Sequence, residues 1–273
     1  MSTQSSPSVL LSLQAAFNRA PLLHYTTAGG LDWGVRDSGG AGASLVLLPG
    51  SLGTADIFFH QIEAFGQSHR CLTVDYPSAS ATALADGLAE LLGLLNVARA
   101  HLLGASLAGY WLQHFAARHP QRAAGVVLAN TFCDSDELSH HPLFNVAALR
   151  ASTGEEVKAN WLASLEARPP GELRDIQIVL LRNGQSGDVL RSRLLAAATA
   201  EPSPIVPLSQ DRIAIIDCED DPLLAGRTRD KLAERHPEAR RLTLPIGGHY
   251  PHVTQAQHYN TFLKSFLARE TAA

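Results

Sequence analysis

The serine within the stretch HLLGASLAGY, residues 101–110, combines a reactive hydroxyl with an unusual set of neighbours. An apolar run precedes Ser106 and a helical pattern follows it, so the serine lies at a strand-to-helix junction. A sharp turn there exposes the hydroxyl but leaves no room for large side chains two positions away. Gly104 and Ala108 fill those positions. The pattern predicts a nucleophilic Ser106. The pattern is Gly-x-Ser-x-Ala and not Gly-x-Ser-x-Gly, which weakens the match to a nucleophile motif. The alternative is a turn of small residues in which the serine caps a helix.

A serine hydroxyl needs a general base, and His249 has the sequence position that this chemistry requires. It lies in PIGGHYPHV, between the last predicted strand and the last predicted helix. In strand-and-helix proteins with such a serine turn, the chain order is serine, acid, histidine. His252 is expected to begin the final helix instead. His140 and His141 are expected on the surface, so His249 is the predicted base.

The acid that orients this histidine should follow the strand in RIAIIDCEDDPLL, where several carboxylates lie close together. Asp217 still belongs to the strand. Asp221, just before Pro222, is favoured, and Asp220 is the second choice. Asp134, which follows the strand in GVVLANTF, is a third option that the sequence leaves open.

Attack on a carbonyl creates an oxyanion, which two backbone amides should stabilise. One is the amide of Leu107, directly after the serine. The other is that of Ser51, in the loop after the strand LVLLPG. Gly50 and Gly53 should let this loop approach the substrate closely.

The elements that must position these groups alternate between short apolar strands and helical patterns. An opening hairpin, residues 22–39, turns at Gly29 and Gly30. The remaining order predicts an α/β protein with a mostly parallel twisted sheet that helices cover on both faces. Ligands bind such sheets at the carboxyl ends of the strands. The chain is expected to finish with one long helix, PHVTQAQHYNTFLKSFLAR.

Residues 135–208 interrupt this alternation, because they contain no convincing strand. Helical stretches in FNVAALRA, EEVKANWLASLEA and DVLRSRLLAAATA are separated by joints rich in proline and glycine. We therefore expect a core of residues 1–134 and 209–273, with residues 135–208 inserted as a helical cap or lid. Extra helices packed on one edge are the alternative. The apolar residues of this segment could form its core or line a pocket: Leu143, Phe144, Trp161, Leu162 and Leu165.

Composition excludes several classes of function. The net charge is −4, so no basic surface is available for nucleic acid or anionic membranes. No apolar run is long enough to span a bilayer, and the N-terminus lacks the basic flank of a signal peptide. The three cysteines, Cys71, Cys133 and Cys218, are too scattered for a disulfide framework or a zinc site. We expect a cytoplasmic protein without metal or cofactor; the sequence does not indicate its oligomeric state.

The order of elements resembles the α/β-hydrolase superfamily across nearly the whole chain. More specifically, LPGSLGTADIFFHQI, HLLGASLAGY and HPEARRLTLPIGGHYP resemble the maspardin family. Animal members of that family are regarded as binding or trafficking proteins and lack a histidine matching His249. By this resemblance, Asp220 is the closer match to the position of the acid in the maspardin family, and Asp221 is the closer match to its position in other hydrolases.

The leading hypothesis is therefore a serine hydrolase that cleaves a small-molecule carboxylic ester, thioester or lactone, with a weakly apolar acyl chain. The alternative is a maspardin-like adaptor that binds a partner without catalysis, because a fold alone does not establish an activity. Acyl transfer to an alcohol is a third possibility.

Overall fold

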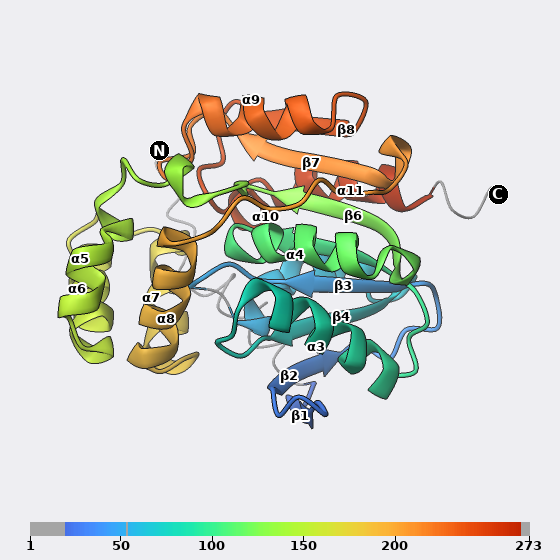
Figure 1. Cartoon of the computed structure of the whole chain (residues 1–273), viewed down its shortest axis with the longest axis horizontal. Helices are drawn as coiled ribbons and strands as arrows, with labels where there is room; N and C mark the ends of the chain where they lie inside the picture. Colours follow the sequence, from blue (N-terminus) through green and yellow to red (C-terminus); the bar gives the residue numbers. More distant parts are fainter. Residues whose placement is uncertain (1–19, 53, 269–273) are drawn as a thin grey trace, which may run out of the picture.

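One eight-stranded sheet organises the molecule, with the strand order β1-β2-β4-β3-β5-β6-β7-β8 (Figure 1). The structure is a computed structural model and describes residues 20–52 and 54–268. The strands are β1 (Leu23–Thr26), β2 (Asp32–Asp37), β3 (Ser44–Leu48), β4 (Arg70–Asp75), β5 (Ala100–Ala105), β6 (Ala123–Ala129), β7 (Ile213–Cys218) and β8 (Arg240–Leu244).

The sheet is antiparallel at one end and parallel elsewhere. β1 pairs with β2 and β2 with β4 in antiparallel fashion, and every later pair is parallel. The predicted hairpin is confirmed, with Gly30 at a φ of 77° in its turn. Parallel strands need long crossovers, which the intervening helices provide. The predicted fold class is therefore correct.

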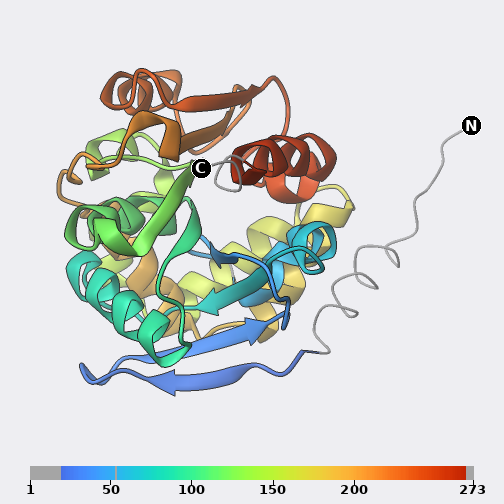
Figure 2. The ribbon, with the colours of Figure 1, turned by 90° about the vertical axis from the view of Figure 1, so that its right-hand side faces the viewer.

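Helices cover both faces of this sheet, as Figure 2 shows. One face packs against α3 (Ala81–Leu94), α4 (Leu107–Arg118) and α9 (Gly226–Arg235), and the other against α2 (Phe59–Phe65) and α11 (Ala256–Leu267). Along β3, Val46 and Leu48 join the first apolar cluster, whereas Leu45 and Leu47 join the second. Because alternate side chains point to opposite faces, a strand covered on both sides is apolar throughout. Three short 3-10 turns occur between these elements: η1 (Ala55–Phe58), η2 (Pro120–Arg122) and η5 (Gln210–Arg212).

The segment between β6 and β7 is helical, as expected, and lies where the arrowheads of β3 and β7 point in Figure 1. It contains η3 (Ser135–Glu137), η4 (Pro142–Phe144), α5 (Val146–Ala151), α6 (Gly154–Glu166), α7 (Glu172–Asn183) and α8 (Gly187–Ala198). The sequence analysis missed α7, although Leu173, Ile176 and Leu180 have the spacing of one helical face. We propose that this helical insertion caps the carboxyl edge of the sheet.

The final helix differs from the prediction, because it is divided into α10 (Pro251–Thr254) and α11. Gln255 breaks the helix with a φ of −129° and a ψ of 35°. The carbonyl of His252 accepts a hydrogen bond of 3.0 Å from Gln61 Nε2 on α2, rather than one from the next helical turn. His252, three residues before the break, is 4% exposed. None of the described helices has the length and apolar character that crossing a membrane requires.

Buried histidines should make folding stability depend on pH. His236 is 2% exposed, and neither of its ring nitrogens has a hydrogen-bond partner among the described residues. Burial, and then the charge of Arg235, lower the pKa of His236 to about 4. In the unfolded chain His236 is protonated below about pH 6.5, whereas in the folded chain it is protonated only below about pH 4. The free energy of unfolding therefore decreases as the pH falls from about 6.5 to about 4.

We expect the free energy of unfolding, measured with urea, to drop between about pH 7 and pH 5 by about 2 kcal/mol for His236 alone. The uncharged variant His236→Gln should lose that part of the slope. His258→Gln, at an exposed position, is the matched control and should keep the wild-type slope. An unchanged slope in His236→Gln would contradict the assignment.

Candidate active site

Ser106 lies at the sharp turn between β5 and α4, as predicted, with a φ of 52° and a ψ of −121°. This is an unfavourable conformation for a residue with a side chain. Neighbouring groups hold it in place. The Ser106 amide donates to the carbonyl of Ala129 at 2.9 Å, and Thr131 Oγ1 donates to the carbonyl of Ser106 at 2.6 Å. The strain is thus supported from β6 and the loop that follows it.

The small residue expected at position 104 is required by the geometry of this turn. A Cβ atom on Gly104 would lie 2.8 Å from the backbone of Ala108 and Gly109. Because these are backbone atoms, they cannot move aside as the end of a flexible side chain can. The turn therefore excludes any residue larger than glycine at position 104.

Asp221 and His249 are brought together by the loops after β7 and β8. His249 Nδ1 and Asp221 Oδ2 are 2.8 Å apart, and their side chains are only 7% and 1% exposed. Burial acts to raise the pKa of Asp221, but the His249 imidazole and the hydrogen bonds to the carboxylate outweigh it, and the pKa lies below its usual value. A carboxylate that stays ionised in this position can orient an imidazole and stabilise its protonated form.

Asp220, the second candidate acid, contacts the backbone of the histidine loop instead of the ring. Its carboxylate accepts hydrogen bonds from the amides of Gly248 at 2.8 Å and Gly247 at 3.2 Å. Gly248 has a φ of 60°, in the region that favours glycine. Asp220 therefore shapes the loop that carries His249, and Asp221 contacts the imidazole.

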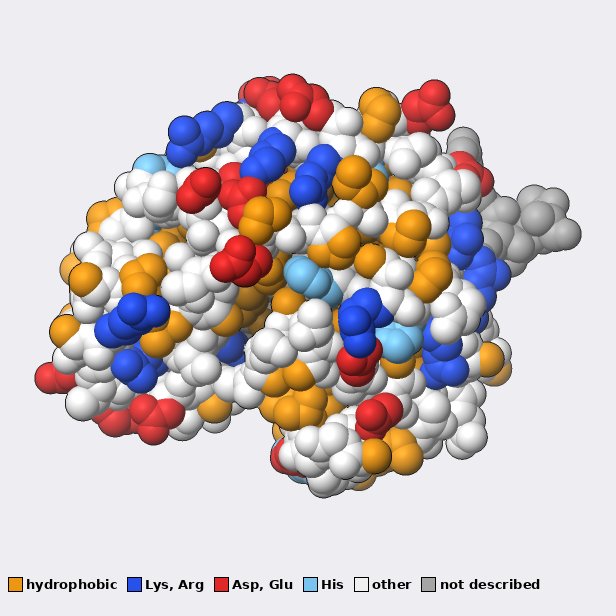
Figure 3. All heavy atoms as spheres, in the orientation of Figure 1, with side chains coloured by type: hydrophobic (Ala, Val, Ile, Leu, Met, Phe, Trp, Pro, Cys, Tyr) orange, Lys and Arg blue, Asp and Glu red, His pale blue; other side chains and the backbone are white. Residues whose placement is uncertain are grey.

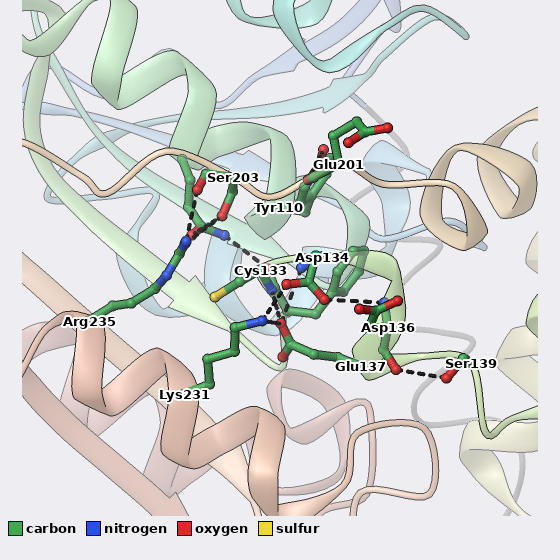
Figure 4. Close-up of polar contacts among 12 residues, drawn as sticks. Tyr110, Cys133, Asp134, Asp136, Glu137, Ser139, Glu201, Ser203, Lys231 and Arg235 are labelled. Atoms are coloured by element: carbon green, nitrogen blue, oxygen red, sulfur yellow. Dashed lines mark hydrogen bonds and ion pairs between the residues drawn. The ribbon is translucent and has the colours of Figure 1, made fainter.

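Asp134, the third candidate, belongs to a different cluster, drawn in Figure 4. Its carboxylate pairs with Lys231 of α9 and caps η3 by accepting from the amide of Asp136. Lys231 also lies 3.4 Å from Glu137. Within the described part of the chain, no hydrogen bond joins Asp134 to His249.

Ser106 and His249 line one small cavity of about 30 Å³, together with Ser51, Trp161 and Tyr250. No hydrogen bond joins Ser106 Oγ to His249 among residues 20–52 and 54–268. Hydrogen bonds of this kind are often long in a site without substrate and tighten when substrate binds. Ser106 and His249 therefore both border the same small cavity.

The two predicted oxyanion donors, Leu107 and Ser51, belong to segments that adjoin Ser106. Leu107 is the first residue of α4, where amides have no acceptor within the helix. A Cβ on Gly50 would lie 3.0 Å from Ser106 Cβ, so the loop carrying Ser51 passes directly against the serine. Gln185 Nε2, from the insertion, donates to the carbonyl of Ser51 at 3.1 Å. Gly53 lies outside the described residues.

Asn130 is a polar residue that the sequence analysis missed. Its side-chain nitrogen donates to Asp221 Oδ2 at 2.8 Å and to the carbonyl of Gly248 at 3.2 Å. It follows β6 directly and has a φ of 41°, a conformation that asparagine tolerates better than most residues. Its position after a strand was visible in the sequence, but its partners come from a distant loop.

His141, expected on the surface, lines a larger cavity of about 520 Å³ beside His249. Its ring nitrogen Nδ1 accepts from the amide of Leu143 at 3.2 Å. Burial, and then the charges of His140, His249 and Arg168, lower the pKa of His141 despite the opposing effect of Asp221. The insertion thus contributes a polar group to the space next to the predicted base.

A mostly parallel sheet, a strained serine after a central strand and a histidine–aspartate pair on later loops together define the α/β-hydrolase architecture. The family model described as "Alpha/beta hydrolase family" matches residues 45–258. The chain therefore belongs to the α/β-hydrolase family.

The individual relatives include maspardin and proteins named as hydrolases. Human maspardin is 28% identical over 249 residues, which cover 86% of this chain and 79% of maspardin. The Yersinia enterocolitica protein named "Putative carbamate hydrolase RutD" is 27% identical over 252 residues, covering 84% of this chain and 89% of RutD. A hydrolase structure from Pseudomonas aeruginosa superimposes with a TM-score of 0.74 at 25% identity, covering 92% of this chain and 99% of that one. The maspardin-like character suggested by the sequence is confirmed.

Proposed function

We infer that this protein is a serine hydrolase that cleaves a carboxylic ester, with thioesters and lactones as related substrates. Ser106 is the nucleophile, His249 the general base and acid, and Asp221 the carboxylate that orients the imidazole. The amides of Leu107 and Ser51 stabilise the oxyanion.

The observation that carries this proposal is the hydrogen bond between Asp221 and His249, on an imidazole that lines the same cavity as Ser106. Nδ1 of His249 is occupied by the carboxylate, so Nε2 is left to take the serine proton. The strained turn of Ser106 further supports the proposal, because strain of this kind persists only where the surrounding structure maintains it.

The reaction follows from these positions. Ser106 Oγ attacks the carbonyl carbon while His249 accepts its proton, and the negative oxygen binds the two amides. His249 then donates the proton to the departing alcohol oxygen, and the bond between that oxygen and the acyl carbon breaks. Water, activated by the same imidazole, hydrolyses the acyl-enzyme and releases the acid.

A non-catalytic adaptor is the second candidate, favoured by the similarity to maspardin. A fluorophosphonate probe distinguishes the two functions, because it bonds covalently only to an activated serine. We expect stoichiometric labelling of the wild type, detected by intact mass, and none of Ser106→Ala. A folded wild-type protein that stays unlabelled would favour the adaptor.

Asn130 should act as a positioning residue in this reaction. Asn130→Gly keeps the backbone conformation available but removes the hydrogen bond to the Asp221 carboxylate. Since hydrogen bonds to charged groups contribute about 1.5–3 kcal/mol, kcat should fall on the order of 10- to 100-fold. KM should change little, because the amide does not line either cavity beside His249. A fall explained entirely by a lower melting temperature, with normal kcat at low temperature, would refute this role.

A further inference from the structure

Two cavities of very different size meet at His249. The smaller, about 30 Å³, contains Ser106 and Ser51. The larger, about 520 Å³, contains neither of these residues and extends from the imidazole into the helical insertion. Leu143, Trp161, Leu223, His249 and Tyr250 line both, so the cavities adjoin.

The chemistry of the proposed reaction assigns the two ends of a substrate to these spaces. The departing oxygen takes its proton from His249, so the alcohol lies on the imidazole side of the scissile bond. The oxyanion points to the amides of Ser51 and Leu107. The rest of the acyl group must therefore occupy the space around Ser106.

Well-packed side chains form part of the wall of that space. Leu52, Ile57 and His252 line it, and each is at most 4% exposed. A volume of about 30 Å³ admits about two water-sized groups, which suits an acetyl group but not a longer chain.

The larger cavity, by contrast, has the size and the lining of a site for a sizeable apolar group. Leu149, Val157, Leu173 and Pro222 contribute apolar surface, and Asn160 and Arg168 add polar groups. Leu149, Val157 and Asn160 come from α5 and α6 of the helical insertion, and Leu173 comes from α7.

We propose that the substrate is an ester of a short acid of acetyl size with a bulky, mainly apolar alcohol. This inference rests on the proposed function and replaces the apolar acyl chain expected from the sequence. It assigns the helical insertion to recognition of the alcohol.

A separate cavity of about 340 Å³ offers the main competing location for a long acyl chain. It lies between α8 and the core helices, and Leu107, Tyr110 and Trp111 line it. Figure 3 shows the molecule hollowed between the insertion and the core on this face, with hydrophobic side chains in the hollow. This cavity of about 340 Å³ has no lining residue in common with the cavity of Ser106, so it does not adjoin the proposed site of acyl attachment.

Two isomeric esters test the proposal, because hexyl acetate and ethyl hexanoate have the same size but reversed chains. We expect kcat/KM for hexyl acetate to exceed that for ethyl hexanoate by at least about tenfold. Equal values, or the reverse preference, would overturn the inference and leave the proposed function standing. Protein that hydrolyses neither ester would overturn the inference, and if it also resists the fluorophosphonate probe, the proposed function fails with it.

Neighbouring residues of α5 provide a matched pair of variants. Ala148 lines the large cavity, whereas Ala147 is exposed and does not. Ala148→Trp should reduce the ratio of kcat/KM for hexyl acetate to kcat/KM for ethyl hexanoate by at least about fivefold. The indole would fill part of the cavity that we assign to the alcohol group. Ala147→Trp should keep the wild-type preference. An unchanged preference in Ala148→Trp would contradict the assignment of this cavity.

Discussion

Ser106→Ala is expected to lower kcat/KM for p-nitrophenyl acetate by about 10⁴-fold or more. The alanine keeps the volume of the turn and removes only the hydroxyl, so no acyl-enzyme can form. The remaining rate would come from water attacking a carbonyl held at the amides of Leu107 and Ser51, which supports only weak catalysis.

Steady-state kinetics on purified protein, with thermal unfolding to confirm the fold, measure this effect. Ser139→Ala is the control: its hydroxyl donates to the carbonyl of Asp136, far in sequence from the turn at position 106, and its rate should equal that of the wild type. Activity in Ser106→Ala close to the wild-type level would show that another group attacks the ester.

The succession of strands and helices along the chain and the serine turn were predictable because they depend on local patterns. Buried parallel strands are continuously apolar, and the small residue at Gly104 is imposed by contacts with its own chain neighbours Ala108 and Gly109. The position of His249 on the loop between the last strand and the last helix was predictable from the local pattern of elements. These signals lie within short stretches of sequence, so a single chain reveals them.

The acid was harder to choose because Asp220 and Asp221 are adjacent and both act on the same loop. Which of them contacts the ring depends on how the chain turns after β7, and the amides of Leu223 and Leu224 fix that turn by donating to Asp221 Oδ1 at 2.8 and 3.2 Å. Asn130 was missed for a related reason. Its partner Asp221 lies 91 residues further along the chain, and no local pattern indicates their contact.

The division of the final helix also arises from a distant contact. The sequence of residues 251–269 favours a continuous helix, but Gln61 from α2 binds the carbonyl of His252. His252 is buried next to this break, and burial lowers its pKa to about 3. Both His252 and His249 line the cavity of Ser106. Of these two, His249 is the one whose ring contacts a carboxylate, that of Asp221.

Asp221→Asn is expected to lower kcat on the order of 10³- to 10⁴-fold, although the replacement keeps the shape of the side chain. An amide nitrogen facing His249 Nδ1 favours the wrong tautomer of the imidazole and cannot stabilise its positive charge. Asp220→Asn, the neighbouring and chemically identical change, alters only the bonds to the amides of Gly247 and Gly248. It should cost less than about tenfold in kcat, since one of the two amides keeps an oxygen acceptor on the asparagine and neither hydrogen bond involves the imidazole.

Measuring both variants on the same ester separates a carboxylate that acts on the ring from one that acts on the loop. Fluorophosphonate labelling rates should follow the same order, because labelling depends on activation of Ser106 and not on the alcohol of the substrate. If Asp220→Asn lost more activity than Asp221→Asn, the carboxylate closest to the maspardin pattern would be the acid in solution. The loop after β7 would then have to rearrange on substrate binding, and the hydrogen bond between Asp221 and His249 would describe only the empty site.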